Sequence, residues 1–172
     1  DRLVDAKPAS GRRGVLRLLN AISDATFVQT QIDDRRHSLL DDALMHAVRV
    51  VHPGSLVLIF SDFYHLNQDS RRYISRLIRH NDLVACQVLD PLECAPPNPG
   101  RYLISDGQQK TTLDTSGRHN RQRYRHLIES RDDSLRSMLS EFNIPLVQLV
   151  NGEDISTILT RAFGHKQGAR RI

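Results

Sequence analysis

Cysteine, tryptophan and long apolar runs are scarce in this chain, and each scarcity excludes a class of protein. The 172 residues include two cysteines and no tryptophan. Two cysteines cannot form the disulfide framework that stabilises a small secreted domain. No apolar run approaches the roughly 18 residues that a membrane-spanning helix needs, and no signal peptide is visible in the sequence. We therefore expect a cytoplasmic protein.

The residues that are present have the composition of an ordinary globular domain. Apolar residues make up 39% of the chain, charged residues make up 26%, and the formal net charge is +4. This balance provides enough apolar residues for a core, and it permits an acidic partner without requiring one. The length predicts a single domain over residues 1–172, and the polar, basic end at 164–172 is expected to be a flexible tail.

The apolar run Leu56–Phe60 is the centre of the predicted fold. A proline and a glycine precede it, and a serine and an aspartate follow it. Such a run is typical of a strand that is covered on both faces, as in a parallel sheet flanked by helices. Further strands are predicted at 83–88 and 146–150, and the first two strands are spaced for a right-handed crossover. The expected fold is therefore α/β, with three layers and a mostly parallel sheet.

Helical periodicity and turn signals complete the predicted fold. Apolar residues at helical spacing predict helices at about 12–22, 39–51, 69–80, 116–142 and 153–163. The segment Pro91–Gly100 is rich in proline and is expected to be irregular. An inserted hairpin is predicted at 101–114, with an Asp-Gly pair at its turn.

The first predicted helix has a basic start and an apolar stripe. Its basic, glycine-containing start at 11–14 is interpreted as the beginning of a helix, and a phosphate cradle is the alternative. The apolar stripe of this helix is expected to be buried. It consists of Val15, Leu18, Leu19 and Ile22.

Several motifs in a fixed order resemble a known family. These motifs are Pro8-Ala-Ser-Gly-Arg-Arg-Gly14 before a leucine-rich helix, Leu58-Ile-Phe-Ser-Asp-Phe63, Val88-Leu-Asp-Pro-Leu-Glu93, and the hairpin aspartates Asp106 and Asp114. Together they are similar to the MoxR-associated bacterial proteins catalogued as domain-of-unknown-function family fifty-eight. The resemblance covers nearly the whole chain and implies the C-terminal portion of a von Willebrand factor A-like domain, with a Rossmann-like sheet. On this basis the chain is expected to be a fragment that lacks the first strand and helix of that domain.

The resemblance also implies a divalent-ion site at the strand ends. In the wider superfamily the ligands come from an Asp-x-Ser-x-Ser motif, a threonine in a second loop and an aspartate in a third. Asp62 matches the third position and Ser38 matches the second, whereas the first motif is missing from this sequence. Two protein groups and water would hold Mg²⁺ weakly. We therefore expect no cofactor in this chain, and Mg²⁺ in a longer protein that carries the first motif.

Three carboxylates are candidates for binding a partner at the carboxyl edge of the sheet, where ligands bind in open α/β folds. They are Asp62, Asp90 and Glu93. A simpler interpretation is open for Asp62, Asp90 and Ser38. Asp62 would cap the loop or the helix that follows it, and Asp90 would bond to loop amides. Ser38 would cap the helix after it, with Asp41 completing an approximate capping box.

For function, the resemblance implies a protein-interaction module that acts with a MoxR-type AAA ATPase on an unknown client during complex assembly or maturation. We expect no enzymatic activity, because no nucleophile elbow or zinc-binding histidine pair occurs in the sequence. A cryptic hydrolase remains one alternative. A basic nucleic-acid-binding domain is another, although helical spacing spreads the arginines of the long helix around its surface. These arginines are Arg118, Arg121, Arg123, Arg125 and Arg131.

The implied strand order also bears on association. The strand with the first motif would lie beside the strand at 56–61. Without it, one edge of that strand has no neighbour, and unpaired edges are templates for pairing with another chain. We therefore expect a homodimer of this chain, formed by edge pairing or by exchange of the N-terminal segment.

Overall fold

The structure is a computed structural model that describes residues 4–7, 9–27, 36–105 and 110–164. Side chains at 26–27 and 36–38 lie outside this description, as do the hairpin turn with Asp106 and the tail at 165–172. The elements, in chain order, are α1 (Gly11–Phe27), α2 (Arg36–Val50), β1 (Leu56–Ser61), α3 (Gln68–Leu77), β2 (Asp82–Leu89), α4 (Pro91–Cys94), β3 (Arg101–Ser105), β4 (Lys110–Asp114), α5 (Arg118–Glu141), β5 (Leu146–Val150) and α6 (Ile155–Gly164). None of the described helices is both long enough and apolar enough to cross a membrane.

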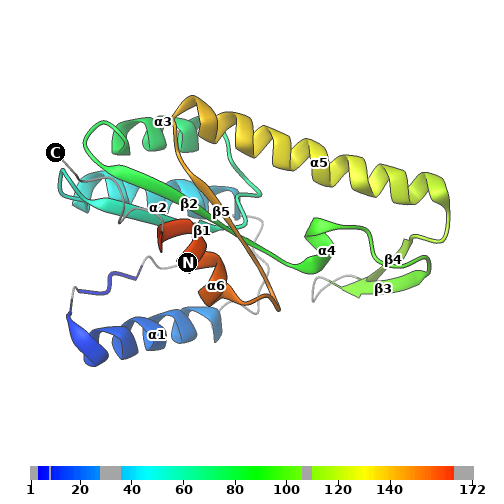
Figure 1. Ribbon diagram of the computed structural model, residues 1–172, viewed down its shortest axis with the longest axis horizontal. Helices are drawn as coiled ribbons and strands as arrows, with labels where there is room; N and C mark the ends of the chain where they lie inside the picture. Colours follow the sequence, from blue (N-terminus) through cyan, green and yellow to red (C-terminus); the bar gives the residue numbers. More distant parts are fainter. Residues whose placement is uncertain (1–3, 8, 28–35, 106–109, 165–172) are drawn as a thin grey trace.

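A parallel sheet of three strands, in the order β1-β2-β5, forms the centre of the fold (Figure 1). The predicted α/β fold, its three parallel strands and its antiparallel β3–β4 hairpin are confirmed. The middle strand is β2, which pairs on both sides, and β1 lies at an edge of the described sheet, in line with the expected unpaired edge of that strand.

Alternation along β2 divides the core into two layers. Leu83 and Ala85 belong to a large cluster with residues of α2, α3 and α5. Val84 and Cys86 point the other way and pack with β5 residues against α6. Because successive side chains of a strand lie on opposite faces, β2 is buried from both sides and holds the two layers together.

The second face of β1 is exposed, which contradicts the expectation that this strand is covered on both faces. Val57 and Ile59 pack against the large cluster. The alternating residues Leu56, Leu58 and Phe60 are 60%, 43% and 56% exposed. The reason is that α6 packs on β5 and on the second face of β2, and none of the described elements covers β1 on that side.

The apolar stripe of α1 is also exposed, contrary to the expectation that it is buried. Val15, Leu18, Leu19 and Ile22 are each more than half exposed. Its basic, glycine-containing start does begin a helix, as interpreted from the sequence. A Cβ at Gly14 would lie 2.0 Å from the carbonyl oxygen of Ala9, so only glycine fits there.

Side-chain caps fix the start of α3 and connect it to α2. Asn67 accepts hydrogen bonds from the amides of Asp69 and Ser70, and Ser70 in turn accepts from the amide of Asn67. The buried Ser70 hydroxyl and the side-chain nitrogen of Asn67 both donate to Asp41 of α2, at 2.5 and 2.6 Å. Asp41 is therefore a partner of the α3 cap. Ser38 is not the residue before its helix, because α2 already begins at Arg36.

The first half of α5 extends beyond the sheet, where it runs beside α4 and the β3–β4 hairpin (Figure 1). The buried Thr115 closes the base of the hairpin: its hydroxyl donates to the Asn98 carbonyl at 2.8 Å and accepts from the Gly100 amide at 3.2 Å. The half-buried Asp114 accepts hydrogen bonds from Ser116, which are the main cause of its lowered pKa.

The two faces of the sheet predict different costs for the same substitution. Leu83→Ala removes a buried side chain of β2, so we expect it to lower the free energy of unfolding by about 2–5 kcal/mol. The matched substitution Leu58→Ala, on the exposed face of β1, should change it by less than about 1 kcal/mol. Urea denaturation measures both values, and a similar large loss for both variants would show that the face of β1 is covered in solution.

The open edge of β1 predicts association of this chain. We expect a dimer at tens of micromolar, because unpaired strand edges beside exposed apolar side chains recruit further strands. Light scattering coupled to gel filtration measures the mass. Leu58→Lys, which places a charge on the exposed face without touching the core, should restore the monomer. A wild-type monomer with protected β1 amides would contradict this prediction.

Candidate functional site

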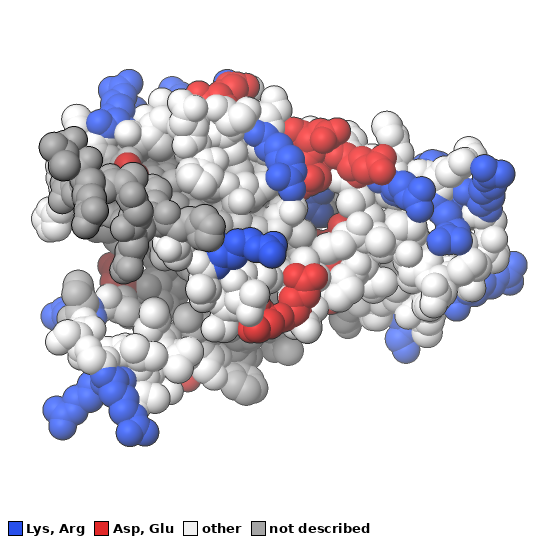
Figure 2. All heavy atoms as spheres, viewed as in Figure 1, with Lys and Arg blue, Asp and Glu red and all other residues white. Residues whose placement is uncertain are grey.

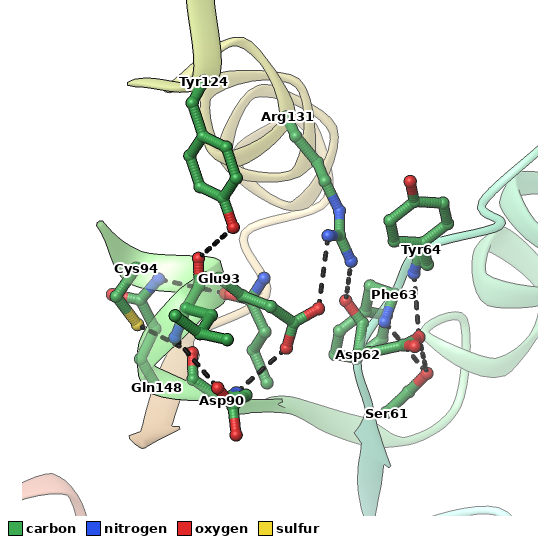
Figure 3. Close-up of polar contacts among 12 residues, drawn as sticks. Ser61, Asp62, Phe63, Tyr64, Asp90, Glu93, Cys94, Tyr124, Arg131 and Gln148 are labelled. Atoms are coloured by element: carbon green, nitrogen blue, oxygen red, sulfur yellow. Dashed lines mark hydrogen bonds and ion pairs between the residues drawn. The ribbon is translucent and has the colours of Figure 1, made fainter. Parts of the chain in front are cut away.

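The carboxyl ends of β1 and β2 meet at one edge of the sheet, as parallel pairing requires. Asp62 follows β1, and Asp90 follows β2 and leads into α4. The middle of α5 passes over this edge and adds Arg131 (Figure 3). We refer to Tyr64, Glu93 and Arg131, with the backbone of Asp62, as the strand-end bridge.

Asp62 organises the loop after β1. Its carboxylate accepts from the amide of Tyr64 at 2.9 Å and is 3.5 Å from the hydroxyl of Ser61. That hydroxyl also accepts from the amide of Phe63 at 3.0 Å. Phe63 has φ 53°, in the left-handed region that non-glycine residues rarely adopt, and burial of its ring in the large cluster holds it there.

Asp90 and Glu93 form a capping box around α4, a short helix within the segment that was expected to be irregular. The carboxylate of Asp90 accepts from the amide of Leu92, and Glu93 accepts from the amide of Asp90, both at 2.9 Å. The interpretation of Asp90 as a carboxylate bonded to loop amides is therefore correct. Proline at the first helical position, which lacks an amide hydrogen, suits this start.

Arg131 connects α5 to both strand ends. One terminal nitrogen donates to the backbone carbonyl of Asp62 at 3.1 Å, and the other lies 3.5 Å from a Glu93 carboxylate oxygen. The guanidinium carbon lies 3.9 Å from the centre of the Tyr64 ring, which is close enough for a cation–π interaction. Sequence reasoning placed Arg131 among the solvated arginines, because spacing along one helix does not show what faces it.

The structure thus brings three of the four candidate residues together. Asp62 and Glu93 meet through Arg131, and Asp90 joins them through Glu93 (Figure 3). Ser38 lies within α2, and its side chain is outside the described residues.

Mg²⁺ is the ion that the resemblance implies at the strand ends. No group of three or more histidine, cysteine or carboxylate side chains in the described part of the chain is arranged to hold a metal ion. Arg131 places a positive charge beside Asp62 and Glu93. Because Mg²⁺ needs near-octahedral oxygen coordination, the described side chains do not fit this ion.

A cavity of about 680 Å³ adjoins the strand-end bridge, between α4, α5 and the ends of β2 and β5. Tyr124 lines it and donates from its hydroxyl to the carbonyl of Leu92 at 2.8 Å. Burial raises the pKa of Tyr124, and the charges of Glu93 and Asp90 raise it further. This phenol therefore stays protonated near neutral pH.

Cys94 also lines the cavity and is a poor nucleophile there. Burial raises the pKa of its thiol, and the nearby Glu93 adds to the effect. The thiol donates weakly to the carbonyl of Asp90 at 3.6 Å. Since the thiolate is the reactive form of cysteine, this site does not activate Cys94.

A family model described as "Protein of unknown function DUF58" matches residues 3–134 of the chain. This segment ends inside α5 and includes the strand-end bridge. No curated protein gives a significant match. No solved structure does so either.

The environment of Cys94 predicts its reactivity. Glu93→Gln removes the largest charge effect on its pKa, so alkylation by iodoacetamide near neutral pH should become faster, by about twofold or more. Mass spectrometry of the modified peptides measures the rate, and the fully buried Cys86 serves as an unreactive reference. Glu129→Gln, which also changes a cavity carboxylate, should leave the rate unaltered. An equal effect of both variants would contradict the assignment to Glu93.

Proposed function

Because this chain belongs to the family described as proteins of unknown function DUF58, we propose that it is a protein-interaction module without catalytic activity. We propose that it acts with a MoxR-type AAA ATPase in the assembly or maturation of a client complex in the cytoplasm. The proposal includes a von Willebrand factor A-like fold, with Mg²⁺ bound only in a longer protein that carries the first metal motif. The family resemblance supports the MoxR-type ATPase as the partner. The side chains of the strand-end bridge support binding as the kind of function.

The observation that carries this proposal is the composition and rigidity of the strand-end bridge. Arginine and tyrosine side chains meet there, and these residue types are enriched among those that dominate binding energy at protein interfaces. Tyr64 remains 58% exposed although its ring contacts Arg131. Leu92 and Leu127 add exposed apolar surface beside it. Because intramolecular bonds already hold Arg131, little conformational entropy would be lost when a partner binds.

The same contacts argue against catalysis at this edge. Asp62, Asp90 and Glu93 are all engaged with loop amides or with Arg131. The thiol of Cys94 has a raised pKa. A catalytic site needs a base or nucleophile whose pKa is matched to its task, and these groups are arranged to hold the loops in place.

A basic nucleic-acid-binding domain is the second candidate, and one observation favours it. Figure 2 shows lysine and arginine side chains gathered at the end of the molecule where α5 begins beside the hairpin. The described residues 101–105 and 110–126 contain six cationic side chains and one carboxylate, Asp114. The cationic residues are Arg101, Lys110, Arg118, Arg121, Arg123 and Arg125. Clustered cations of this kind bind phosphates.

Binding to the MoxR-type ATPase of the same organism tests the first proposal. We expect Tyr64→Ala and Arg131→Ala to weaken binding about tenfold or more, as interface anchors do. Arg72→Ala is the matched control, because Arg72 on α3 is exposed and its ion pair is with its helix neighbour Asp69. Calorimetry measures the affinities. A complex that is equally stable with all three variants would contradict an interface at the bridge.

DNA-binding measurements on the same variants distinguish the interaction module from the nucleic-acid-binding domain. Binding of duplex DNA with a steep dependence on salt, lowered by Arg123→Ala and unchanged by Arg131→Ala, would favour the basic end of the molecule. No ATPase binding together with such DNA binding would replace the first proposal by the second.

A further inference from the structure

The cavity beside the strand-end bridge combines apolar walls with a polar floor. Its walls are formed by Leu89, Leu92, Tyr124, Leu127, Ile128 and Val150. Its floor is formed by Gln87 of β2 and Gln148 of β5. These two glutamines are direct neighbours in the parallel register, so strand alternation places both on the face that α5 covers.

A hydrogen-bond network fixes the orientation of both glutamine amides. Arg136 can only donate, and it donates to the Gln148 oxygen at 2.8 Å. Asp132 accepts from the Gln148 nitrogen at 3.0 Å. The same nitrogen donates to the Gln87 oxygen, also at 3.0 Å. Since the Gln87 oxygen is engaged, its nitrogen must face away from Gln148.

The Gln87 amide nitrogen has no acceptor among the described residues, although the side chain is only 3% exposed. A second unpaired donor is close by, because Nε of Arg131 is buried and lacks a partner within the described part of the chain. Both residues line the cavity. The Gln87 nitrogen is not among the fully buried unpaired atoms, so it is open to an acceptor oxygen from outside the chain.

The charges around the cavity decide which acceptor is suitable. Glu93, Glu129 and Asp132 line it, and Arg131 is the cationic side chain among the lining residues. Arg131 is already paired with Glu93, and Arg136 outside the lining pairs with Asp132. A carboxylate ligand would meet excess negative charge. A neutral carbonyl oxygen would accept from Gln87 without that repulsion.

We propose that this cavity binds an apolar anchor side chain of a partner protein, and that the backbone carbonyl next to the anchor accepts from Nε2 of Gln87. The inference rests on the proposed interaction function and names the chemistry that its partner presents. A protein partner fits because the cavity is continuous with the bridge: Tyr64 and Arg131 line both. The exposed Leu127, at 66%, extends the apolar wall to the surface.

Two small probes test this proposal on the full chain by nuclear magnetic resonance. N-acetyl-leucine N-methylamide carries an apolar side chain between neutral carbonyls, whereas N-acetyl-leucinate ends in a carboxylate. We expect the neutral probe to shift the side-chain amide signals of Gln87 saturably, together with the signals of Leu89 and Val150. The carboxylate probe should bind at least about fivefold more weakly, because like charges oppose it.

Variants distinguish the predicted carbonyl contact from nonspecific hydrophobic binding. Gln87→Met keeps the size and removes the donor, together with the oxygen that accepts from Gln148, so it should weaken the neutral probe about tenfold. Gln122→Met on the exposed face of α5 is the matched control and should leave binding unchanged. Leu127→Asp, at the exposed rim, should also weaken binding, and it provides a test that does not disturb the buried floor.

Three outcomes would overturn the inference. They are no shift at the cavity up to the solubility of the neutral probe, tighter binding of the carboxylate, or equal binding to wild-type protein and to both cavity variants. The ATPase measurement is independent of these results. Probe binding at Gln87 without ATPase binding would reject the proposed partner and leave the cavity chemistry standing. ATPase binding that Arg131→Ala weakens, without probe binding at the cavity, would reject the cavity alone.

Discussion

Burial of β2 on both faces is the constraint on which the rest of this structure depends. Leu83 and Ala85 require helices on one side, and Val84 and Cys86 require a helix on the other. The chain supplies α2, α3 and α5 for the first face and α6 for the second. Pairing with β1 and β5 satisfies the backbone groups of β2 on both edges, which a buried strand needs because orphan amides are costly.

The core ends where the candidate site begins. Near the carboxyl end of the sheet, the register aligns Ser61, Gln87 and Gln148 across the three strands. On the side covered by α5, apolar packing thus gives way to hydrogen bonds among Gln87, Gln148, Asp132 and Arg136. The long α5 contributes to both zones. Its second half packs Leu135 and Leu139 into the core, and its middle supplies Arg131 to the strand-end bridge.

This division is the basis on which we propose recognition and not chemistry for this edge. Its charged groups pair with one another or bond to loop amides, so their hydrogen-bonding capacity is used to hold the loops around Asp62 and Asp90 in place. What remains available to an outside molecule is an aromatic ring, apolar surface and the unpaired amide nitrogen of Gln87. These features are typical of the centre of a protein interface. The cationic side chains of the hairpin and of the start of α5 lie at a separate end of the molecule (Figure 2), so the two candidate functions depend on different surfaces.

The sequence by itself determined the class of fold, because local patterns are sufficient for that purpose. Continuous apolar runs marked the three parallel strands, and the hairpin was predicted from its turn residues. Asp62, Asp90 and Glu93 could be placed at one edge, since parallel strands end together. Tertiary structure alone decided that β2 is the middle strand, that Leu56, Leu58 and Phe60 are exposed, and that α1 leaves its apolar stripe uncovered. It also decided that Arg131 reaches Glu93, and that Gln87 pairs with Gln148 and leaves a donor free. These contacts join residues far apart in the chain, and their partners depend on strand order and helix placement, which periodicity within one segment does not encode.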